Sequence, residues 1–276
     1  MTERGDVYQL ALASLDDAGV HYIVQRGEAT WPTVHGDLDL LVHPSEVEAA
    51  VGATWRGMTE ADSGPVVVCR HVDIPVVVAL GQDRQEIAEV DLAPRTSWAA
   101  GEFLDLSRVL GERRRSPRDV WSASPGDASA LLGVPALLGS AAARRSKGAT
   151  RLEHIQELVA ADPAGAQAAW EEALGSRGAA RALAAVAAGD LSALSRLAAV
   201  ARPWRTARNL LRSPRPTLRR LAFVGWRRQR QATCGLWRSR GSSLVPLRSL
   251  SDDGRWAEIV REVVTNHPES FGSAGS

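Results

Sequence analysis

The stretch Val34-His35-Gly36-Asp37-Leu38-Asp39-Leu40-Leu41-Val42 is the feature that most constrains this chain. Its two carboxylates, Asp37 and Asp39, alternate with leucines. On a β-strand, residues i and i+2 point to the same side, so the carboxylates project together while Leu38 and Leu40 face a core. Like charges held this close repel each other, and a hard divalent cation with oxygen ligands relieves that repulsion. The stretch therefore predicts a metal-binding strand, although the solvated face of an edge strand gives the same pattern.

The residues on both sides of this stretch predict a small sheet with helices. Apolar residues at helical spacing favour a helix over 6–18, ended by Gly19. Short apolar runs predict strands over 20–24 and 65–79, and residues 86–92 alternate with period two. We expect the last of these to pair in an antiparallel hairpin, which makes the sheet mixed. The fold class is thus α/β (α+β), a small mixed sheet with flanking helices followed by a mostly helical region.

Changes in composition divide the chain into three parts. Residues 1–115 carry the predicted sheet, and an arginine run with a proline marks their end. Residues 116–201 are rich in alanine and predict a helical domain. Residues 202–276 form an Arg/Trp-rich segment that we expect to be disordered in part, because 202–248 contain thirteen arginines and no acidic residue.

The order of these features resembles the nucleotidyltransferase fold of the DNA polymerase β superfamily. That signature is a strand, a glycine, a spacer of about ten residues, Asp-apolar-Asp, and a third carboxylate on a neighbouring strand. Here these positions hold Gly27, Asp37-Leu38-Asp39 and Asp91. A bacterial subgroup associated with polysaccharide or natural-product genes is more similar still, through Arg26-Gly27, Pro32 and Gly36-Asp37-Leu38-Asp39. The resemblance covers roughly residues 5–160.

The resemblance implies an acidic site that holds two Mg²⁺ ions. Asp37 and Asp39 would bind both ions, which lie roughly 4 Å apart in such sites. Asp91 would complete the site and take the proton of the acceptor hydroxyl. Glu89 is the alternative third acid, since it shares a strand face with Asp91.

The resemblance also implies contacts to a nucleoside triphosphate as co-substrate, ATP among the candidates. Arg26, Gly27 and Glu28 stand at the triphosphate-binding step, with Glu28 where the signature has Gly or Ser. Lys147, the only lysine of the chain, and Arg151 fit the basic residues that related transferases bring onto the phosphates. A solvated cationic loop is the alternative for both.

We therefore expect a magnesium-dependent nucleotidyltransferase that moves a nucleoside monophosphate to a small hydroxylated acceptor, such as a sugar or an antibiotic-like molecule. One rival is a phosphotransferase on the same fold. Another is a non-catalytic accessory protein with a degenerate transferase domain, supported by Glu28 and by the Arg-rich tail. Residues 202–248 suit nucleic acid or another polyanion, and equally an anionic membrane. The polar N-terminus predicts a cytoplasmic protein, and the oligomeric state is open.

Overall fold

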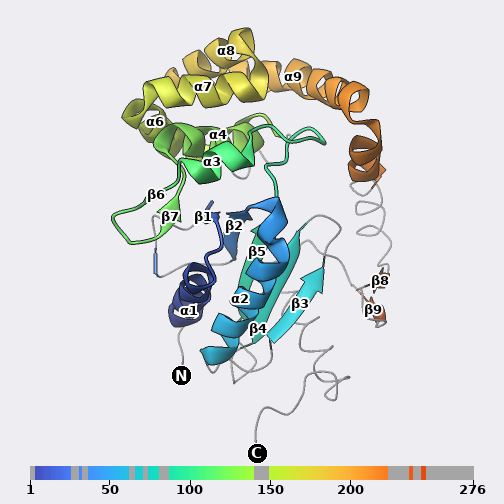
Figure 1. The fold of residues 1–276 in the computed structure, drawn as a ribbon. Helices are drawn as coiled ribbons and strands as arrows, with labels where there is room; N and C mark the ends of the chain where they lie inside the picture. The colour runs from blue at the N-terminus through green and yellow to red at the C-terminus, as the bar shows by residue number, and fades with distance from the viewer. Residues whose placement is uncertain are drawn as a thin grey trace, which may run out of the picture. The chain divides into compact units, whose positions relative to one another are not determined.

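The computed structural model describes residues 4–25, 31–32, 37–61, 66–70, 74–80, 87–139, 149–222, 236–238 and 244–246. The chain forms two compact units. Unit 1 comprises residues 1–94 and 223–276, and unit 2 comprises residues 95–222. Unit 1 contains a mixed sheet with helices and unit 2 is mostly helical, so the predicted fold class is confirmed (Figure 1).

A five-stranded sheet forms the centre of unit 1, with the strand order β1-β2-β5-β4-β3. The strands are β1 (Tyr22–Val24), β2 (Leu38–Val42), β3 (Val66–Arg70), β4 (Pro75–Leu80) and β5 (Ile87–Ala93). Strands β2 and β5 run parallel, and the other neighbouring pairs are antiparallel. The sheet is therefore mixed, and the predicted antiparallel hairpin of β4 and β5 is confirmed.

Helices α1 (Arg4–Asp17) and α2 (Val47–Glu60) pack against this sheet (Figure 1). Gly19 ends the first helical segment with a φ of +67°, in the left-handed region that glycine adopts at low cost. The short 3₁₀ helix η2 (Pro44–Glu46) leads into α2. At Gly57 of α2 the two helices approach so closely that a Cβ atom would overlap the backbone of Leu10. This close contact holds the two helices together beneath the sheet.

Unit 2 is built mainly from helices. The helices are α3 (Leu106–Gly111), α4 (Pro125–Leu137), α6 (Ala149–Ala161), α7 (Pro163–Leu174), α8 (Ser176–Ala187) and α9 (Leu191–Arg212). Side chains of Asp105, Ser124, Asp162 and Asp190 cap the starts of α3, α4, α7 and α9 by accepting backbone N–H bonds. Among the helices of the described residues, none is both long and apolar enough to cross a bilayer.

Trp170 of α7 is the largest fully buried side chain of this unit. Its indole N–H donates to Ser129 Oγ on α4 at 3.0 Å. A Cβ atom at Gly133 would lie 2.5 Å from Trp170 Cζ2, so the absent side chain makes room for the ring. Because helices α4 and α7 meet at this ring, the alanine-rich helices gain a core that their small side chains alone do not supply.

The contacts of the chain divide it between Pro94 and Arg95, ahead of the division predicted at 115/116. The arginine run near that predicted boundary belongs to unit 2, in a hairpin of β6 (Arg114–Arg115) and β7 (Trp121–Ser122). Arg113 and Arg115 stack on the ring of Trp121 at 4.6 and 4.4 Å. The run is therefore part of folded structure and not a linker.

The predicted Arg/Trp-rich segment begins inside a helix. Helix α9 runs through residue 201 to Arg212, and residues 214–222 are also helical. Further along, β8 (Leu236–Arg238) and β9 (Leu244–Pro246) pair antiparallel. Residues 202–222 are thus part of unit 2.

Candidate metal centre

Strand β2 positions the first two carboxylates. Leu38 and Leu40 are fully buried, and they anchor the strand on its apolar side. Asp39 lies between them in sequence and is only 8% exposed, whereas Asp37 is exposed and directly precedes the strand. The alternation thus separates a leucine face from a carboxylate face, as the sequence predicts.

Strand β5 brings the third carboxylate beside them. Asp91 is paired in register with Asp39 on the neighbouring parallel strand. Val90 and Leu92, on either side of Asp91, are buried. Side chains that are in register on adjacent strands point to the same face of the sheet. Asp37, Asp39 and Asp91 consequently offer ligand oxygen atoms that all lie within 4.8 Å of one another. The convergence that the sequence predicts is therefore present in the structure.

The geometry identifies Asp91, and not Glu89, as the third acid of the cluster. The sequence alone did not distinguish the two residues. Within the described part of the chain, the carboxylates that converge closely enough to share an ion are Asp37, Asp39 and Asp91, without Glu89. The pairing of β2 with β5 begins at Leu38 and Val90, so Glu89 lies just beyond it. The backbone N–H of Glu89 donates a hydrogen bond to the hydroxyl of buried Tyr8 at 3.1 Å. This bond ties α1 to β5 next to the carboxylate cluster.

The cluster has the chemistry of a site for a hard divalent cation. Three carboxylates supply only oxygen ligands, which Mg²⁺ and Mn²⁺ prefer. Their negative charges repel one another at this separation, and burial of Asp39 strengthens the repulsion because the surrounding dielectric is lower. A cation between the three side chains would turn this repulsion into attraction, so the donor set fits the ion that the motif implies.

The described residues do not test the predicted nucleotide contacts. Arg26, Gly27 and Glu28 lie outside the described part of the chain, as does Lys147. Arg151 is on α6 in unit 2, whereas the carboxylates are in unit 1. The role of these five residues in holding a triphosphate therefore stays a prediction.

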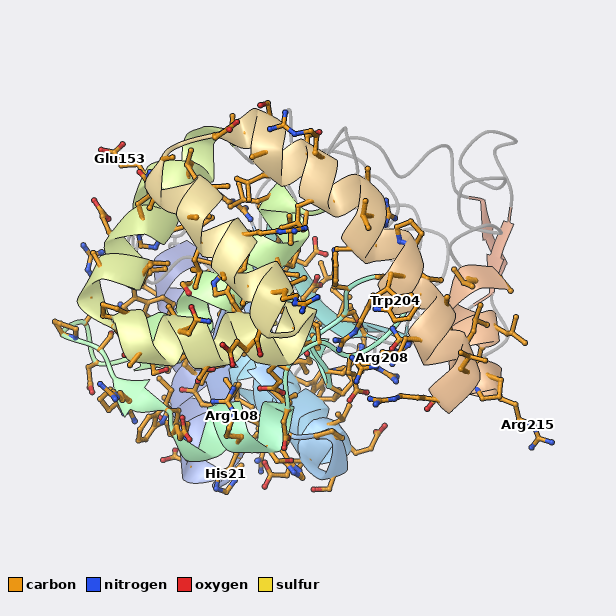
Figure 2. The ribbon with its side chains drawn as sticks, turned by 90° about the horizontal axis from the view of Figure 1, so that it is seen from above. His21, Arg108, Glu153, Trp204, Arg208 and Arg215 are labelled. Carbon is orange, nitrogen blue, oxygen red and sulfur yellow. The ribbon has the colours of Figure 1, made fainter. Side chains whose placement is uncertain are left out.

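A second charged cluster, in unit 2, was not predicted. Arg108 of α3 donates two hydrogen bonds to buried Asp127 of α4, at 3.0 and 2.7 Å. It donates a third to Glu172 of α7 at 3.0 Å, and Glu172 also accepts the backbone N–H of Asp105. The bonds to Asp127 raise the pKa of the Arg108 guanidinium. In Figure 2, Arg108 is labelled on the ribbon of unit 2.

One local signal of this second cluster was available in the sequence. Ser124 and Asp127 form a Ser-x-x-Asp pattern ahead of an apolar run, which resembles a helix-capping box. In the structure, Ser124 Oγ accepts the Asp127 backbone N–H and donates to the Asp127 carboxylate. Arg108 and Glu172 are distant in sequence, so no local pattern points to them. Each acid of this cluster has hydrogen-bond donors within the protein, and we interpret the cluster as structural.

Comparison of the chain with models of protein families, with curated proteins and with solved structures finds no match. The carboxylate cluster and the motif that contains it are therefore the observations that bear on function.

Proposed function

We propose that this protein is a magnesium-dependent nucleotidyltransferase that transfers a nucleoside monophosphate from an NTP to a small hydroxylated acceptor. The observation that carries the proposal is the convergence of Asp37, Asp39 and Asp91 on two adjacent strands. The order of Gly27, the Asp-apolar-Asp pair and the later strand acid supports the same reading.

The three carboxylates have different environments, which suggest different roles. Asp39 is buried at the centre of the cluster, so it suits a fixed ligand shared by two ions. Asp37 is exposed at the start of β2, where it can reach toward an ion and its nucleotide. Bound Mg²⁺ would neutralise the phosphate charge and hold the attacking and leaving oxygens.

Asp91 suits the role of general base. In the proposed reaction it accepts the proton of the acceptor hydroxyl. The freed oxygen attacks the α-phosphorus, the bond to the bridging oxygen breaks, and pyrophosphate leaves. A base must lie within hydrogen-bond reach of the proton that it removes. The register that places Asp91 beside Asp39 would keep it next to the bound α-phosphate.

The experiment is incubation of the purified protein with the four NTPs, Mg²⁺ and a panel of sugars and amino-sugar antibiotics, followed by mass spectrometry. We expect an acceptor that gains a nucleoside monophosphate, with one pyrophosphate formed for each transfer. Asp91→Asn should lower the rate by a factor on the order of 10³. Glu89→Gln is the matched control, because Glu89 lies on the same strand outside the cluster, and it should keep the activity.

The same experiment separates the rival functions. An acceptor that gains only a phosphoryl group would assign the protein to the phosphotransferases. Absence of any NTP turnover across the panel, in a protein that binds nucleic acid or membranes, would support the non-catalytic accessory role and contradict the proposal.

A further inference from the structure

Helix α9 exposes a stripe of large apolar side chains. Val200, Trp204 and Leu211 are 71%, 69% and 87% exposed, the three highest values among the large apolar residues of the described chain. They are spaced by four and seven residues. At about 100° per residue they fall within a sector of roughly 40° on one face of the helix. We call these three residues the α9 stripe.

The opposite side of α9 is fixed to the rest of unit 2. Leu194 and Ala198 are buried there. Arg205 donates to the carbonyl oxygens of Glu102 and Ala173, both at 2.8 Å. These contacts hold the helix in one rotational orientation, so the α9 stripe cannot turn inward to be buried.

The turn over residues 98–101 adds a second attachment. Ala99 and Ala100 have φ angles of 50° and 61°, which are unfavourable for alanine. Thr206 and Asn209 both donate to the carbonyl oxygen of Ala99, at 3.2 and 3.3 Å. The inner side of α9 is thus held by a turn whose backbone angles are strained.

Arginines lie beside the α9 stripe without acidic neighbours on the helix: at about 100° per residue, Arg208 is roughly 60° and Arg212 roughly 100° from the centre of the stripe, on the side of Arg205. Helix α9 contains no Asp or Glu, and its arginines continue into residues 214–222. No ion pair within the described chain involves Arg208, Arg212 or Arg215. Burial lowers the pKa of Arg205, and the positive charges of Arg208 and Arg212 lower it further. The labelled Trp204, Arg208 and Arg215 lie along this part of the ribbon, and Arg215 extends away from it (Figure 2).

The combination of charge and exposed aliphatic groups identifies the partner. A second copy of α9 would bring arginines against arginines, which disfavours self-association. A nucleic acid would use the arginines, but it gives Val200 and Leu211 no apolar partner, since stacking on bases requires aromatic or planar groups. An anionic lipid surface satisfies both, because its headgroups attract the arginines and its interface accepts tryptophan and aliphatic side chains.

We propose that the outer face of α9 binds the surface of an anionic lipid bilayer. Val200, Trp204 and Leu211 enter the interface, and Arg208, Arg212 and Arg215 contact the lipid phosphates. This interaction is separate from the proposed transferase chemistry, and it would bring the protein to acceptors or products at a membrane.

The test is flotation of the full-length protein with phosphatidylcholine vesicles, with and without about one third phosphatidylglycerol. We expect binding only to the anionic vesicles, weakening as salt rises because exposed charges are screened. Trp204→Ser/Leu211→Ser should weaken binding at least about ten-fold, because two buried apolar groups are lost. Arg208→Gln/Arg212→Gln should weaken it on the order of 25-fold, since each arginine near the surface contributes about five-fold.

Trp55→Ser is the matched control, because Trp55 is a 44% exposed tryptophan on α2, outside the α9 stripe. It should leave vesicle binding unchanged. Wild-type protein that fails to float with anionic vesicles would overturn the proposal. So would both double variants that keep wild-type circular dichroism and wild-type binding, because any membrane contact would then lie elsewhere in the chain. Salt-sensitive binding to single-stranded polynucleotide in place of vesicles would assign the arginines to nucleic acid and also overturn it.

Discussion

Both units of this protein bring acidic side chains together, but the acids meet different surroundings. In unit 2, Asp127 and Glu172 converge on Arg108, and Ser124 and a backbone N–H add further donors. In unit 1, Asp37, Asp39 and Asp91 converge on one another. The first arrangement compensates charge inside the protein. The second brings like charges together around a point that suits a cation, and this difference marks the cluster of unit 1 as the candidate metal site.

Removing one charge from each cluster should have opposite effects on the free energy of unfolding. Arg108→Met leaves the buried carboxylate of Asp127 without its main cation. Breaking a buried pair typically costs about 3–5 kcal/mol, and the loss here should be about 2–4 kcal/mol because Arg108 is one third exposed. Urea denaturation should show this decrease in the free energy of unfolding.

The double variant Arg108→Met/Asp127→Asn is the control for that prediction, because it removes the buried charge together with its partner. It should recover part of the lost stability. An unchanged urea midpoint for Arg108→Met would mean that the cluster of unit 2 does not stabilise the fold. The two clusters would then not differ in their contribution to stability.

The next effect concerns the helices that support the carboxylate strands. Gly57→Ala places a methyl group against the backbone of Leu10, so it should push α1 away from α2 and cost about 1–3 kcal/mol. Gly52→Ala, five residues earlier on the exposed side of α2, meets nothing within 4 Å. It should stabilise the protein by up to about 1 kcal/mol through helix propensity. Equal thermal shifts for the two variants would contradict the close helix approach.

A smaller effect is expected on the pH dependence of stability through Asp190. Like Asp127, this carboxylate accepts hydrogen bonds from the protein itself. The backbone N–H of Ala193, then Ser192, lowers the pKa of Asp190 below its ordinary value of 3.8. A lowered folded-state pKa means that the contribution to stability is complete above about pH 3.8 and is lost as the pH falls through the folded value.

Asp190→Asn keeps an oxygen acceptor for the start of α9, so it should change stability little at pH 7. It should flatten the pH dependence of the melting temperature below pH 4, an effect read from thermal melts of both proteins between about pH 2 and 5. Identical pH profiles for the two proteins would contradict a stabilising charge at Asp190.

The smallest stability effect is expected at the carboxylate cluster. Without metal, Asp37→Asn removes one of three mutually repelling charges at an exposed position. The free energy of unfolding should stay within about 0.5 kcal/mol of wild type or rise slightly. A large loss of unfolding free energy, measured by urea denaturation in the presence of a chelator, would mean that Asp37, like Asp127, is stabilised by charged or hydrogen-bonding partners within the protein.

Much of unit 1 could be predicted because its signals are local. Alternation in β2 and β5 separates the leucine and valine faces from the carboxylate faces. That the two strands are neighbours, which the convergence of Asp37, Asp39 and Asp91 also needs, was implied by the family resemblance. The choice between Asp91 and Glu89 did not follow, because both occupy one face of β5. Only the register, which pairs Asp39 with Asp91, distinguishes them.

The sequence revealed less about unit 2, because its decisive contacts join distant residues. Arg108 and Glu172 are 64 residues apart, and no periodicity connects them. The arginine-rich stretch after residue 201 has the composition of a solvated segment. Arg205 nevertheless donates to main-chain oxygens 32 and 103 residues away, and those bonds keep α9 within the fold. Composition describes the side chains of a segment, whereas its order depends on acceptors elsewhere in the chain.

Metal binding by the carboxylate cluster can be measured by calorimetric titration of Mn²⁺ into the wild type, Asp37→Asn and Glu89→Gln, after treatment with a chelator. We expect the wild type and Glu89→Gln to bind the ion with similar affinity and Asp37→Asn to lose most of the binding, because a neutral amide oxygen replaces one of three charged carboxylate ligands. Wild-type affinity in Asp37→Asn, or no Mn²⁺ binding by the wild-type protein, would show that Asp37, Asp39 and Asp91 do not form a metal site.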